Sequence, residues 1–382
     1  MTTFGSVTIA RTQEEREAIY RFRYQVYVEE LKRDYPDADH THKWLRDDDD
    51  EQAYTVNFYT GSMEDITGVM RLLLWTPGKV PEHYFQLFSM HIFPGIEQLA
   101  TAEIGRLMIR PDQRGNAIYP SLVSAMYQHL VENDIQLCFL YCVPGLVKHY
   151  RKSLAARPYV APLIPAGSST GIPMVVVVSD SSYFRQSGSL LTEMSEQYFD
   201  SGQKPQLDIT PFQDILEGHS VPVKLDQHAV WEAFQQQLLE RESSPSTFLN
   251  SLAPEVLREL TSSGFILSLS ANDVVAKEGT EEREIYVILK GAFEVMSQNK
   301  RLAILEKGDL FGEVAFFTEA GQRSASVRAL TDGELLVLRR NFLKELTRNH
   351  PDAGFQILTN MGRVMAHRII DLDRALSAIT GE

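Results

Sequence analysis

The sequence predicts two domains, an α/β domain in the first half and an antiparallel β-roll with helices in the second. Three observations support this prediction. The chain has 382 residues, which is more than one ordinary hydrophobic core holds. Strand-like runs alternate with helical patterns up to about residue 186, as in a mixed sheet with flanking helices. Short strand-like runs separated by glycines follow from about residue 245, which is typical of a roll or barrel.

Composition limits the classes of function. Hydrophobic residues make up 43% of the chain, charged residues 23%, and the net charge is −14. An acidic chain is poorly suited to general binding of nucleic acid or anionic membranes, so we expect no nucleic-acid partner. No signal peptide and no membrane span are expected, because no apolar run approaches about 18 residues. The two cysteines, Cys138 and Cys142, suggest neither a disulfide framework nor a metal site, which favours a cytoplasmic protein without a metal.

The elements of the first half follow in order. Thr12 and Glu15 have the spacing of a capping box, and Ile19 and Val26 behind them recur at helical spacing. Pro120 is placed to open a second helix. Strands are predicted from the runs SVTIA, AYTVNFYT, ITGVMRLLLW, AEIGRLMI, LCFLYCV and MVVVV, and a further helix from GLVKHYRKSL.

The second half begins with a connection. Residues 187–244 are predicted as a helical linker, because Gly, Ser, Gln and Pro become frequent and AVWEAFQQQLLE (229–240) is amphipathic. The segment SSPSTFLNSLAPEVLREL is then a short helical entry to the last domain, 245–382. The domain closes on a long helix with the sequence FQILTNMGRVMAHRIIDLDRAL.

The stretch FGEVAFFTEAGQRSASVRA (311–329) places an acid and a base in an apolar segment. A charge in a half-buried loop needs a partner. Backbone N–H groups after Gly312 suit an anion, Arg323 can hold a phosphate, and Ser324 adds a hydroxyl. Glu313 suits a ribose hydroxyl, so a phosphate and a ribose held together describe a cyclic nucleotide. The alternative is an internal ion pair between Glu313 and Arg323.

This stretch resembles the phosphate-binding cassette of the cyclic-nucleotide-binding domains in bacterial cAMP receptor proteins, kinase regulatory subunits and gated channels. The family pattern is FGE[LV]A followed by R[ST]A[ST], and the resemblance covers about residues 246–376. It implies a cyclic-nucleotide-binding fold with cAMP as allosteric ligand, a purine contact near Asp371 to Arg374 and an open choice between cAMP and cGMP. The residues implied to bind it are Phe311, Gly312, Glu313, Val314, Ala315, Arg323, Ser324 and Ala325. No helix-turn-helix follows, so no transcription factor of that layout is expected, and a homodimer through the last helix stays open.

The loop IRPDQRGNAIYPSLVSAMYQHL (109–130) joins a strand to a helix, where backbone N–H groups suit a phosphate. It resembles the pyrophosphate loop RGxGx[GA] of GNAT-type N-acyltransferases, with Arg114 and Gly115 matching. Ala117 and Tyr119 replace the small residues of the family, and Tyr119 would crowd a CoA pyrophosphate. The alternative is an ordinary strand-to-helix turn. The resemblance implies a GNAT-like fold and a donor site of Met108, Ile109, Arg114, Gly115, Asn116 and Ala117.

Further segments resemble autoinducer synthases and related N-acyl amino acid synthases, over about residues 7–178. Those families carry RxxVF, an aspartate-rich turn, GxxRL and ExxR in this order. They commonly take the acyl group from an acyl carrier protein, which fits the altered loop. The matching residues are Arg23, Val26, Tyr27, the run DDDDE, Gly68, Arg71, Leu72, Glu103 and Arg106.

Acyl transfer to an amine needs a base and an acid. Glu103 is the candidate base, directly or through water, and an ion pair with Arg71 or Arg106 is its alternative. Tyr150, in KHYRKS, is the candidate acid, and a core aromatic is its alternative. Residues 47–51 are predicted as a solvated turn, with a grip on the acceptor amine as the alternative. The candidates for acceptor binding are Arg23, Arg71 and Arg106, and a surface or structural role is the alternative for Arg23 and Arg71.

The sequence therefore predicts a cytoplasmic N-acyltransferase regulated by a cyclic nucleotide. It would move an acyl group from a thioester on acyl carrier protein or CoA to a small amine such as an amino acid. Two alternatives stay open: a cAMP-controlled protein lysine acetyltransferase, and a non-catalytic cAMP sensor whose first domain binds an acyl ligand or partner. The predicted domain boundaries are 1–186, 187–244 and 245–382.

Overall fold

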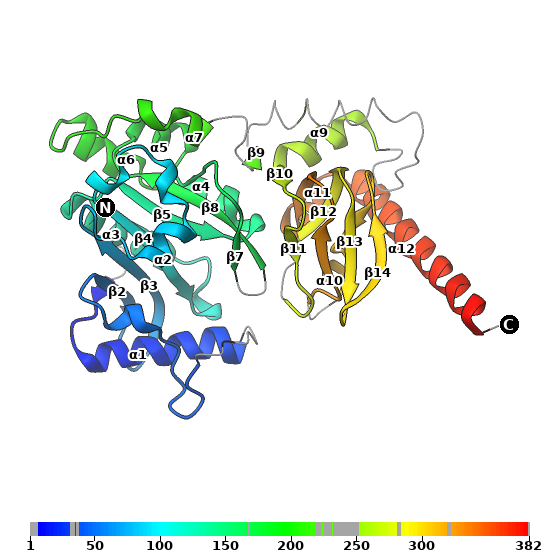
Figure 1. Ribbon diagram of the computed structural model, residues 1–382, viewed down its shortest axis with the longest axis horizontal. Coiled ribbons are helices and arrows are strands. Elements are labelled where there is room, and N and C mark those ends of the chain that lie inside the picture. The colour runs from blue at the N-terminus through cyan, green and yellow to red at the C-terminus, as the bar shows by residue number, and fades with distance from the viewer. Residues whose placement is uncertain are drawn as a thin grey trace. The chain divides into compact units, whose positions relative to one another are not determined.

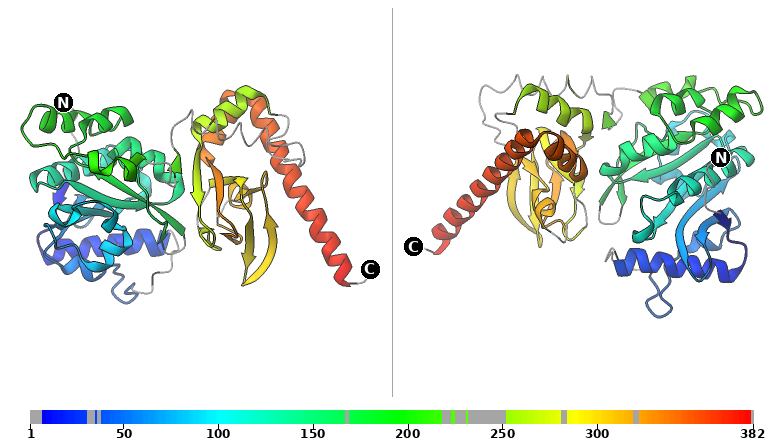
Figure 2. Two further views of the ribbon diagram at one scale, coloured as in Figure 1. Left: turned by 45° about the horizontal axis from the view of Figure 1, so that its top comes forward. Right: turned by 180° about the vertical axis from the view of Figure 1, so that it is seen from behind.

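The computed structural model divides into two compact units, which Figures 1 and 2 show in ribbon form. The first unit consists of Met1–Cys142, Leu146–Ile164 and Ile172–Val221, and Pro222–Glu382 makes up most of the second. The structure describes residues 7–30, 35, 38–166, 169–217, 223–224, 231, 252–280, 284–318 and 322–380. The predicted linker helix at 229–240 lies outside these residues apart from Trp231.

The first unit is built on a mixed sheet in the order β1-β2-β3-β4-β5-β8. Neighbouring strands run antiparallel except β4 and β5, which run parallel. Every strand predicted in this half is present. The strands are β1 (Val7–Ile9), β2 (Thr55–Gly61), β3 (Ile66–Trp75), β4 (Thr101–Ile109), β5 (Leu137–Cys142) and β8 (Ser169–Val177), and the short β6 (Arg157–Pro158) and β7 (Ile164–Ala166) also pair with β8.

Helices cover both faces of this sheet. Helix α1 (Gln13–Tyr24) begins at the predicted capping box, in which Thr12 Oγ1 accepts from the Glu15 N–H at 3.2 Å. It packs with Val69 of β3 and continues as a π-helix over Gln25–Glu30. Helix α3 (Ile118–Glu132) lies on the opposite face, because a Cβ added to Gly68, next to Val69 on the strand, would meet Ile118 at 2.8 Å.

A part of the first unit has no counterpart in the sequence prediction. Between β3 and β4, α2 (Glu82–Leu87) and two 3₁₀ turns, Met90–Ile92 and Ile96–Gln98, cover the sheet with large apolar side chains. Elements this short carry no readable periodicity. After the predicted α4 (Val147–Leu154) come α5 (Ser181–Ser187), α6 (Thr192–Ser195) and α7 (Gln213–Glu217).

The second unit is the predicted antiparallel roll. One sheet has the order β15-β12-β17-β10-β9, and the strands β11-β16-β13-β14 follow one another in the other. The strands are β9 (Val223–Lys224), β10 (Phe265–Leu269), β11 (Val274–Ala276), β12 (Glu284–Lys290), β13 (Phe293–Ser297), β14 (Lys300–Leu305), β15 (Leu310–Phe311), β16 (Ser326–Ala329) and β17 (Gly333–Arg339). The helices are α9 (Pro254–Ser263), α10 (Glu313–Phe317), α11 (Arg340–Asn349) and the long α12 (Pro351–Thr380), which Figure 2 shows as one continuous rod.

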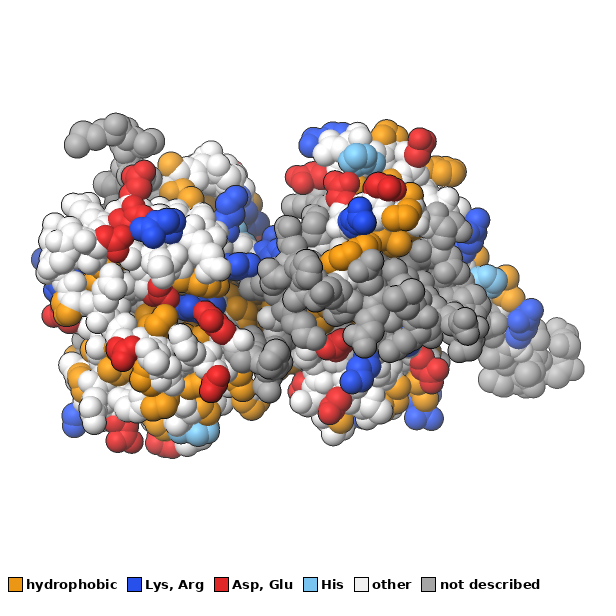
Figure 3. All heavy atoms as spheres, turned by 90° about the horizontal axis from the view of Figure 1, so that it is seen from above, with side chains coloured by type: hydrophobic (Ala, Val, Ile, Leu, Met, Phe, Trp, Pro, Cys, Tyr) orange, Lys and Arg blue, Asp and Glu red, His pale blue; other side chains and the backbone are white. Residues whose placement is uncertain are grey.

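The surface carries both signs of charge. On the face seen in Figure 3, the acidic and basic side chains of the first unit are interspersed, without one broad basic area. No helix among the described residues is long and apolar enough to cross a membrane. Across the same part of the chain, no group of three His, Cys, Asp or Glu side chains is arranged to hold a metal ion.

Candidate functional site

Strands β4 and β5 pair only at their beginnings. Their register ends at the pair Glu103 and Phe139, whereas β4 runs on to Ile109 and β5 to Cys142. A bulge in β4 follows, since the register with β3 shifts and Arg106 has a φ of 53°. Beyond Glu103 the described residues of the two strands do not pair with each other.

Glu103 lies at the last paired position. Its side chain is buried, with 6% of its surface exposed, and its Oε2 has no hydrogen-bond partner within the described part of the chain. Burial raises the pKa of Glu103 to about 7, against the opposing effect of Arg71 and Arg106. The carboxyl group is thus near half ionisation at neutral pH, which suits a general base.

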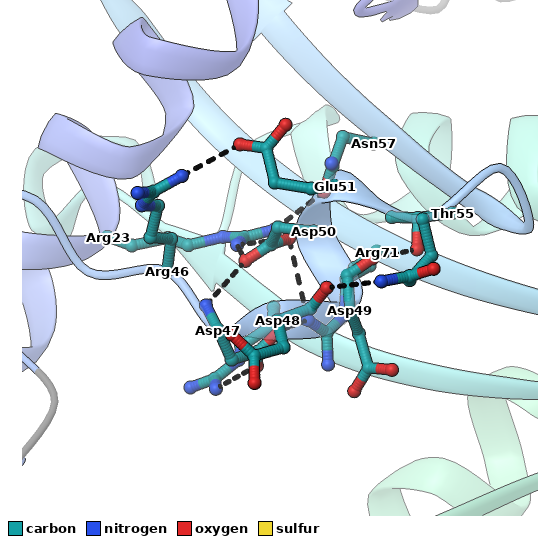
Figure 4. A network of polar contacts seen from close by, with 12 residues as sticks. Arg23, Arg46, Asp47, Asp48, Asp49, Asp50, Glu51, Thr55, Asn57 and Arg71 are labelled. Atoms are coloured by element: carbon teal, nitrogen blue, oxygen red, sulfur yellow. Dashed lines mark hydrogen bonds and ion pairs between the residues drawn. The ribbon is translucent and has the colours of Figure 1, made fainter. Parts of the chain in front are cut away.

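The acidic run 47–51 is solvated only in part, since Asp48 and Glu51 are exposed but Asp50 is buried. It forms a 3₁₀ helix, Asp48–Glu51, in which Asp50 is buried against Arg23 (Figure 4). Arg23 Nη1 donates to both oxygens of Asp50, at 2.8 and 2.7 Å, and its Nη2 donates to Asn57 Oδ1 at 2.6 Å. Arg23 has no exposed surface, which favours the structural role that was the alternative to acceptor binding.

Asp47 joins the other two arginines to this network. Arg71 Nη1 donates to Asp47 at 2.5 Å and Arg106 Nη2 donates to it at 2.7 Å. Although burial alone would raise it, Arg71 and Arg106 hold the pKa of Asp47 well below its usual value. The alternative ion pair of Glu103 with either arginine is not formed among the described residues. Arg106, with 21% of its side chain exposed against 4% for Arg71, is the better placed of the two to meet a ligand.

Two tyrosines hold the same acidic run and were missed from the sequence. Tyr84 of α2 donates to Asp49 Oδ2 at 2.6 Å, and Tyr54 donates to Asp49 Oδ1 at 2.7 Å. The run DDDDE was the only available signal, because Tyr84 is 35 residues away from its partner. The bond from Tyr84 fastens α2 to the network, and the bond from Tyr54 fastens the residue before β2 to it.

The predicted donor loop joins β4 to α3. Met108 and Ile109 end the strand, Gly115 has a φ of 89°, and Asn116 donates to Gln113 Oε1 at 3.1 Å. Ala117 then precedes the first turn of α3, whose outward N–H groups have no intrahelical acceptor. Within the loop the N–H groups of Gln113, Arg114 and Asn116 already donate to carbonyls of the loop. The donor site therefore stays a prediction, and the start of α3 is the part that best suits a phosphate.

The arginines of the loop are already neutralised. Arg114 donates to Glu30 at 2.9 Å and to the carbonyl of Ile109 at 3.1 Å. Arg110 pairs with Asp65 and Asp112. An incoming phosphate would therefore meet mainly the N–H groups at the start of α3.

Tyr150 lies on α4 and is half-buried. Burial raises its pKa well above the usual value, with a smaller contribution from Tyr119, so the phenol stays protonated at neutral pH. The hydroxyl of Tyr119 donates to Ser153 of α4 at 2.6 Å. Tyr119 thereby ties α3 to α4, and its hydroxyl is turned toward that helix.

The cassette of the second unit turns at Gly312, which has a φ of 90° and precedes α10. A Cβ at Gly312 would lie 2.3 Å from Arg323 Nη1 and 2.5 Å from the carbonyl of Glu284, so only glycine fits. Arg323 is buried, donates to that carbonyl at 2.9 Å and lies 5.3 Å from the centre of the Tyr286 ring. The guanidinium is thereby held against the glycine turn.

The acid of the cassette has a partner that the sequence did not reveal. Arg368 of α12 donates to Glu313 and to the carbonyl of Leu310. Within the described residues Glu313 therefore pairs with the last helix, and the alternative ion pair with Arg323 is not formed. The remaining residues of the cassette are neighbours of Glu313 and Arg323 in the sequence. They are Phe311 in β15, Val314 and Ala315 in α10, and Ser324 and Ala325 before β16. Of the predicted purine contacts, Arg374 is exposed and the side chains of 371–373 lie outside the described set.

Comparison with known families assigns both units. The N-acyl amino acid synthase FeeM family matches residues 18–180, and the cyclic nucleotide-binding domain family matches residues 266–350. The chain joins an N-acyl amino acid synthase domain to a cyclic nucleotide-binding domain. Glu103 and the arginine network lie inside the first match, and the whole cassette lies inside the second. The first domain is thus of an N-acyltransferase family, as its motifs predicted.

Individual relatives are similar to parts of the chain. A cGMP-dependent protein kinase of Toxoplasma gondii is 26% identical over 142 residues, 34% of this chain and 14% of the kinase. The Pycsar effector protein BcPycTIR of Burkholderia cepacia is 27% identical over 120 residues, 31% of this chain and 38% of the effector. A solved cyclic nucleotide-binding domain from Methylobacillus flagellatus matches with a TM-score of 0.34 and 20% identity, over 42% of this chain and 92% of that one. The chain thus spans less than half of these two curated relatives, and the fold assignment depends on the topology described above.

Proposed function

We propose that the protein moves an acyl group from an acyl thioester to the amine of an amino acid, and that cAMP bound to the second domain changes the rate. The observation that carries the acyl transfer is Glu103. It is a buried carboxyl group with a pKa raised by burial to about 7, and it lies where β4 and β5 stop pairing. The synthase family match over residues 18–180 supports the same class of reaction.

In the proposed reaction Glu103 takes a proton from the acceptor ammonium, directly or through a water molecule. The amine nitrogen attacks the thioester carbonyl carbon, and the C–S bond breaks as the tetrahedral intermediate collapses to an amide. The thiolate takes a proton from Tyr150. The nitrogen loses two protons in all. One of them replaces the proton that Tyr150 gave to the thiol, and the other passes to solvent, so both side chains return to their starting states.

An α-amino acid fits the charges beside Glu103. Its ammonium would approach the carboxyl group, while its carboxylate would approach Arg106, whose side chain is 21% exposed. Bonds from guanidinium groups to a carboxylate are charge-assisted and directional. Asp47 keeps Arg106 and Arg71 on one carboxylate, so the network would hold the acceptor site in shape.

The donor loop supports a carrier-protein thioester over free CoA. A CoA pyrophosphate gains most from cationic side chains, but Arg110 and Arg114 are both paired with carboxylates. A donor held through its pantetheine arm needs the backbone groups of the parted strands more than it needs these charges. We therefore expect acyl carrier protein thioesters to react faster than the CoA thioesters of the same chain.

The test is thiol release from acetyl, decanoyl and palmitoyl thioesters of CoA and of acyl carrier protein, with each standard amino acid as acceptor. Glu103→Gln should lower turnover about 10²–10⁴-fold with little change in donor affinity, because a general base contributes on this scale. Glu97→Gln, at an exposed glutamate, is the matched control. Equal turnover by wild type and Glu103→Gln removes Glu103 from the mechanism. Acetyl-CoA consumption with a protein acceptor alone would favour the lysine acetyltransferase, and no thiol release with any pair would favour the sensor.

A further inference from the structure

Gly105 lies two residues after Glu103 on β4, so both residues face the same side of the sheet. On β3, Arg71 stands opposite Gly105, and Leu73 stands opposite Glu103. A Cβ added to Gly105 would lie 2.6 Å from Oε1 of Glu103 and 3.1 Å from Oε2. The carboxyl group of Glu103 therefore lies directly over the Cα of Gly105.

The backbone itself does not require glycine at this position. The φ of Gly105 is outside the left-handed region, and its neighbour Arg106 adopts that region instead, with a φ of 53°. Any L residue tolerates the backbone of position 105. The three atoms nearest to the added Cβ all belong to Glu103, so a side chain at this position would disturb that carboxyl group first.

The direction in which Glu103 leans matters for the proposed reaction. Phe139 opposite Glu103 is the last residue of β5 that pairs with β4. By lying over Gly105, the carboxyl group reaches past this last pair toward the part of β4 that has no partner on β5. It also comes level with Arg71, which stands opposite Gly105 on β3.

We propose that Gly105 is a positioning residue for acyl transfer, because the absence of its side chain lets Glu103 reach the parted ends of β4 and β5, where the acceptor amine is deprotonated. This inference rests on the proposed function, in which Glu103 is the base. A side chain at 105 pushes the carboxyl group back toward Phe139 and Leu73, into the apolar part of the same face. It also moves the group away from the charged network, in which Arg71 and Arg106 lower its pKa more than Asp47 and Asp49 raise it.

The test measures decanoyl thioester turnover as a function of pH in Gly105→Ala and Gly105→Ser. We expect kcat to fall at least about tenfold, a share of the contribution of a base, with the KM for the donor unchanged. The midpoint of the pH profile of kcat should move above that of the wild type, since the displaced carboxyl group loses its cationic neighbours. A general loss of structure would not move this midpoint.

Two glycines serve as controls. Gly362→Ala on α12 makes the same change where an added Cβ meets nothing within 4 Å, and it should behave as wild type. Gly68→Ala on β3 places a Cβ 2.8 Å from Ile118. It should lower thermal stability and leave the midpoint of the pH profile where it is.

Glu103→Gln separates the two levels of the proposal. If Glu103→Gln keeps wild-type turnover, the proposed base fails. If Glu103→Gln is inactive but Gly105→Ala keeps the wild-type kcat and pH midpoint, the role of Gly105 is overturned while the proposed function stands.

Thermal unfolding gives a readout without activity. If Gly105→Ala folds poorly, combining it with Glu103→Ala should restore the unfolding temperature of Glu103→Ala alone, because the crowded carboxyl group is gone. A double variant that stays as unstable as Gly105→Ala would overturn the inference.

Discussion

Both domains bury acids and bases, but they assemble them differently. In the synthase domain, Arg23 and Asp50 are 0% and 3% exposed and meet through two hydrogen bonds. In the nucleotide-binding domain, Glu313 and Arg323 are each 4% exposed but do not meet. Glu313 bonds Arg368, whereas Arg323 bonds the backbone carbonyl of Glu284 in β12 and lies 4.0 Å from its carboxylate. A pair that neutralises itself holds the fold and offers little to a ligand. An acid and a base that are kept apart can each take up a ligand group.

The largest effect in this comparison should come from breaking the self-neutralised pair. Asp50→Ala leaves the Arg23 guanidinium buried without an opposite charge, with a hydrogen bond to Asn57 and the ring of Tyr20 as its remaining described contacts. Removal of one partner of a buried ion pair costs about 3–5 kcal/mol. We expect the free energy of unfolding of the synthase domain, measured with urea on the full chain, to fall by this amount.

Glu51→Ala is the matched control for this prediction. Glu51 follows Asp50 in the same 3₁₀ helix, and its partner Arg46 has 48% of its side chain exposed. An exposed pair contributes about 0–1 kcal/mol, so this variant should be nearly as stable as the wild type. If both variants lose a similar free energy of unfolding, the buried network stabilises the domain no more than an exposed ion pair does.

The same contrast explains what could be predicted from the sequence. The cassette spans positions 311–326, so its acid, base, glycine and hydroxyl could be recognised within one stretch. The synthase network draws on α1, the acidic run, β2, β3 and β4, and Arg106 is 59 residues away from Asp47. Alternating patterns predicted every one of these strands, but no local pattern tells that Asp50 is buried. Arg368 was missed for the same reason, since it is 55 residues away from Glu313.

A second test compares two carboxyl groups of the synthase domain. The pKa of Glu103 is raised in the folded state to about 7 from an ordinary 4.5. Its stabilising effect is therefore fully present below pH 4.5 and is lost as the pH rises through 7. Above pH 7 the folded state bears a buried carboxylate, at a cost on the order of 3 kcal/mol. Asp47, with its pKa lowered, has the opposite sign: its stabilising effect is present above its ordinary pKa and is lost as the pH falls below it.

Glu103→Gln should accordingly be more stable than the wild type at pH 8 and similar to it at pH 4. Urea unfolding across this range measures the difference, and wild-type kcat should rise with pH to a plateau above 7. A stability difference that is constant between pH 4 and 8 would contradict the raised pKa of Glu103.

The third test removes the base from the cassette. Arg323→Ala should weaken cAMP binding, measured by calorimetry on the full chain, by about 2–3 kcal/mol, the scale of a lost bond to a charged group. Arg323→Lys keeps the charge but loses the bidentate geometry of the guanidinium. Its cAMP affinity should therefore lie between those of the wild type and Arg323→Ala. Arg328→Ala, at an arginine of β16 with 45% of its side chain exposed and paired with Glu294, is the control that keeps full affinity. The same titrations with cGMP decide between the two nucleotides, and no heat with either would remove the ligand assignment.

The smallest expected effect, and the one that connects the two domains, is the coupling between nucleotide and acyl donor. Glu313 is held by Arg368 of α12, so a ribose hydroxyl that binds Glu313 competes with the anchor of the last helix. Two packings of that helix would then differ in nucleotide affinity, and such couplings are typically about 1–3 kcal/mol, or roughly 5–150-fold. We expect saturating cAMP to raise decanoyl thioester turnover within this range in the wild type, and to leave Arg323→Ala unchanged at the same cAMP concentration.

Thermodynamic linkage adds a quantitative requirement to this last prediction. If cAMP changes the affinity for the acyl donor by a given factor, the donor must change the affinity for cAMP by the same factor. Donor affinity with and without cAMP, and cAMP affinity with and without a non-hydrolysable decanoyl thioester analogue, therefore have to agree. Arg368→Ala tests the proposed competition, because without this anchor on Glu313 the effect of cAMP on turnover should shrink while cAMP still binds. If cAMP binds the wild type and moves neither donor affinity nor turnover, the two domains act independently, and the separated acid and base of the cassette serve a partner other than the synthase domain.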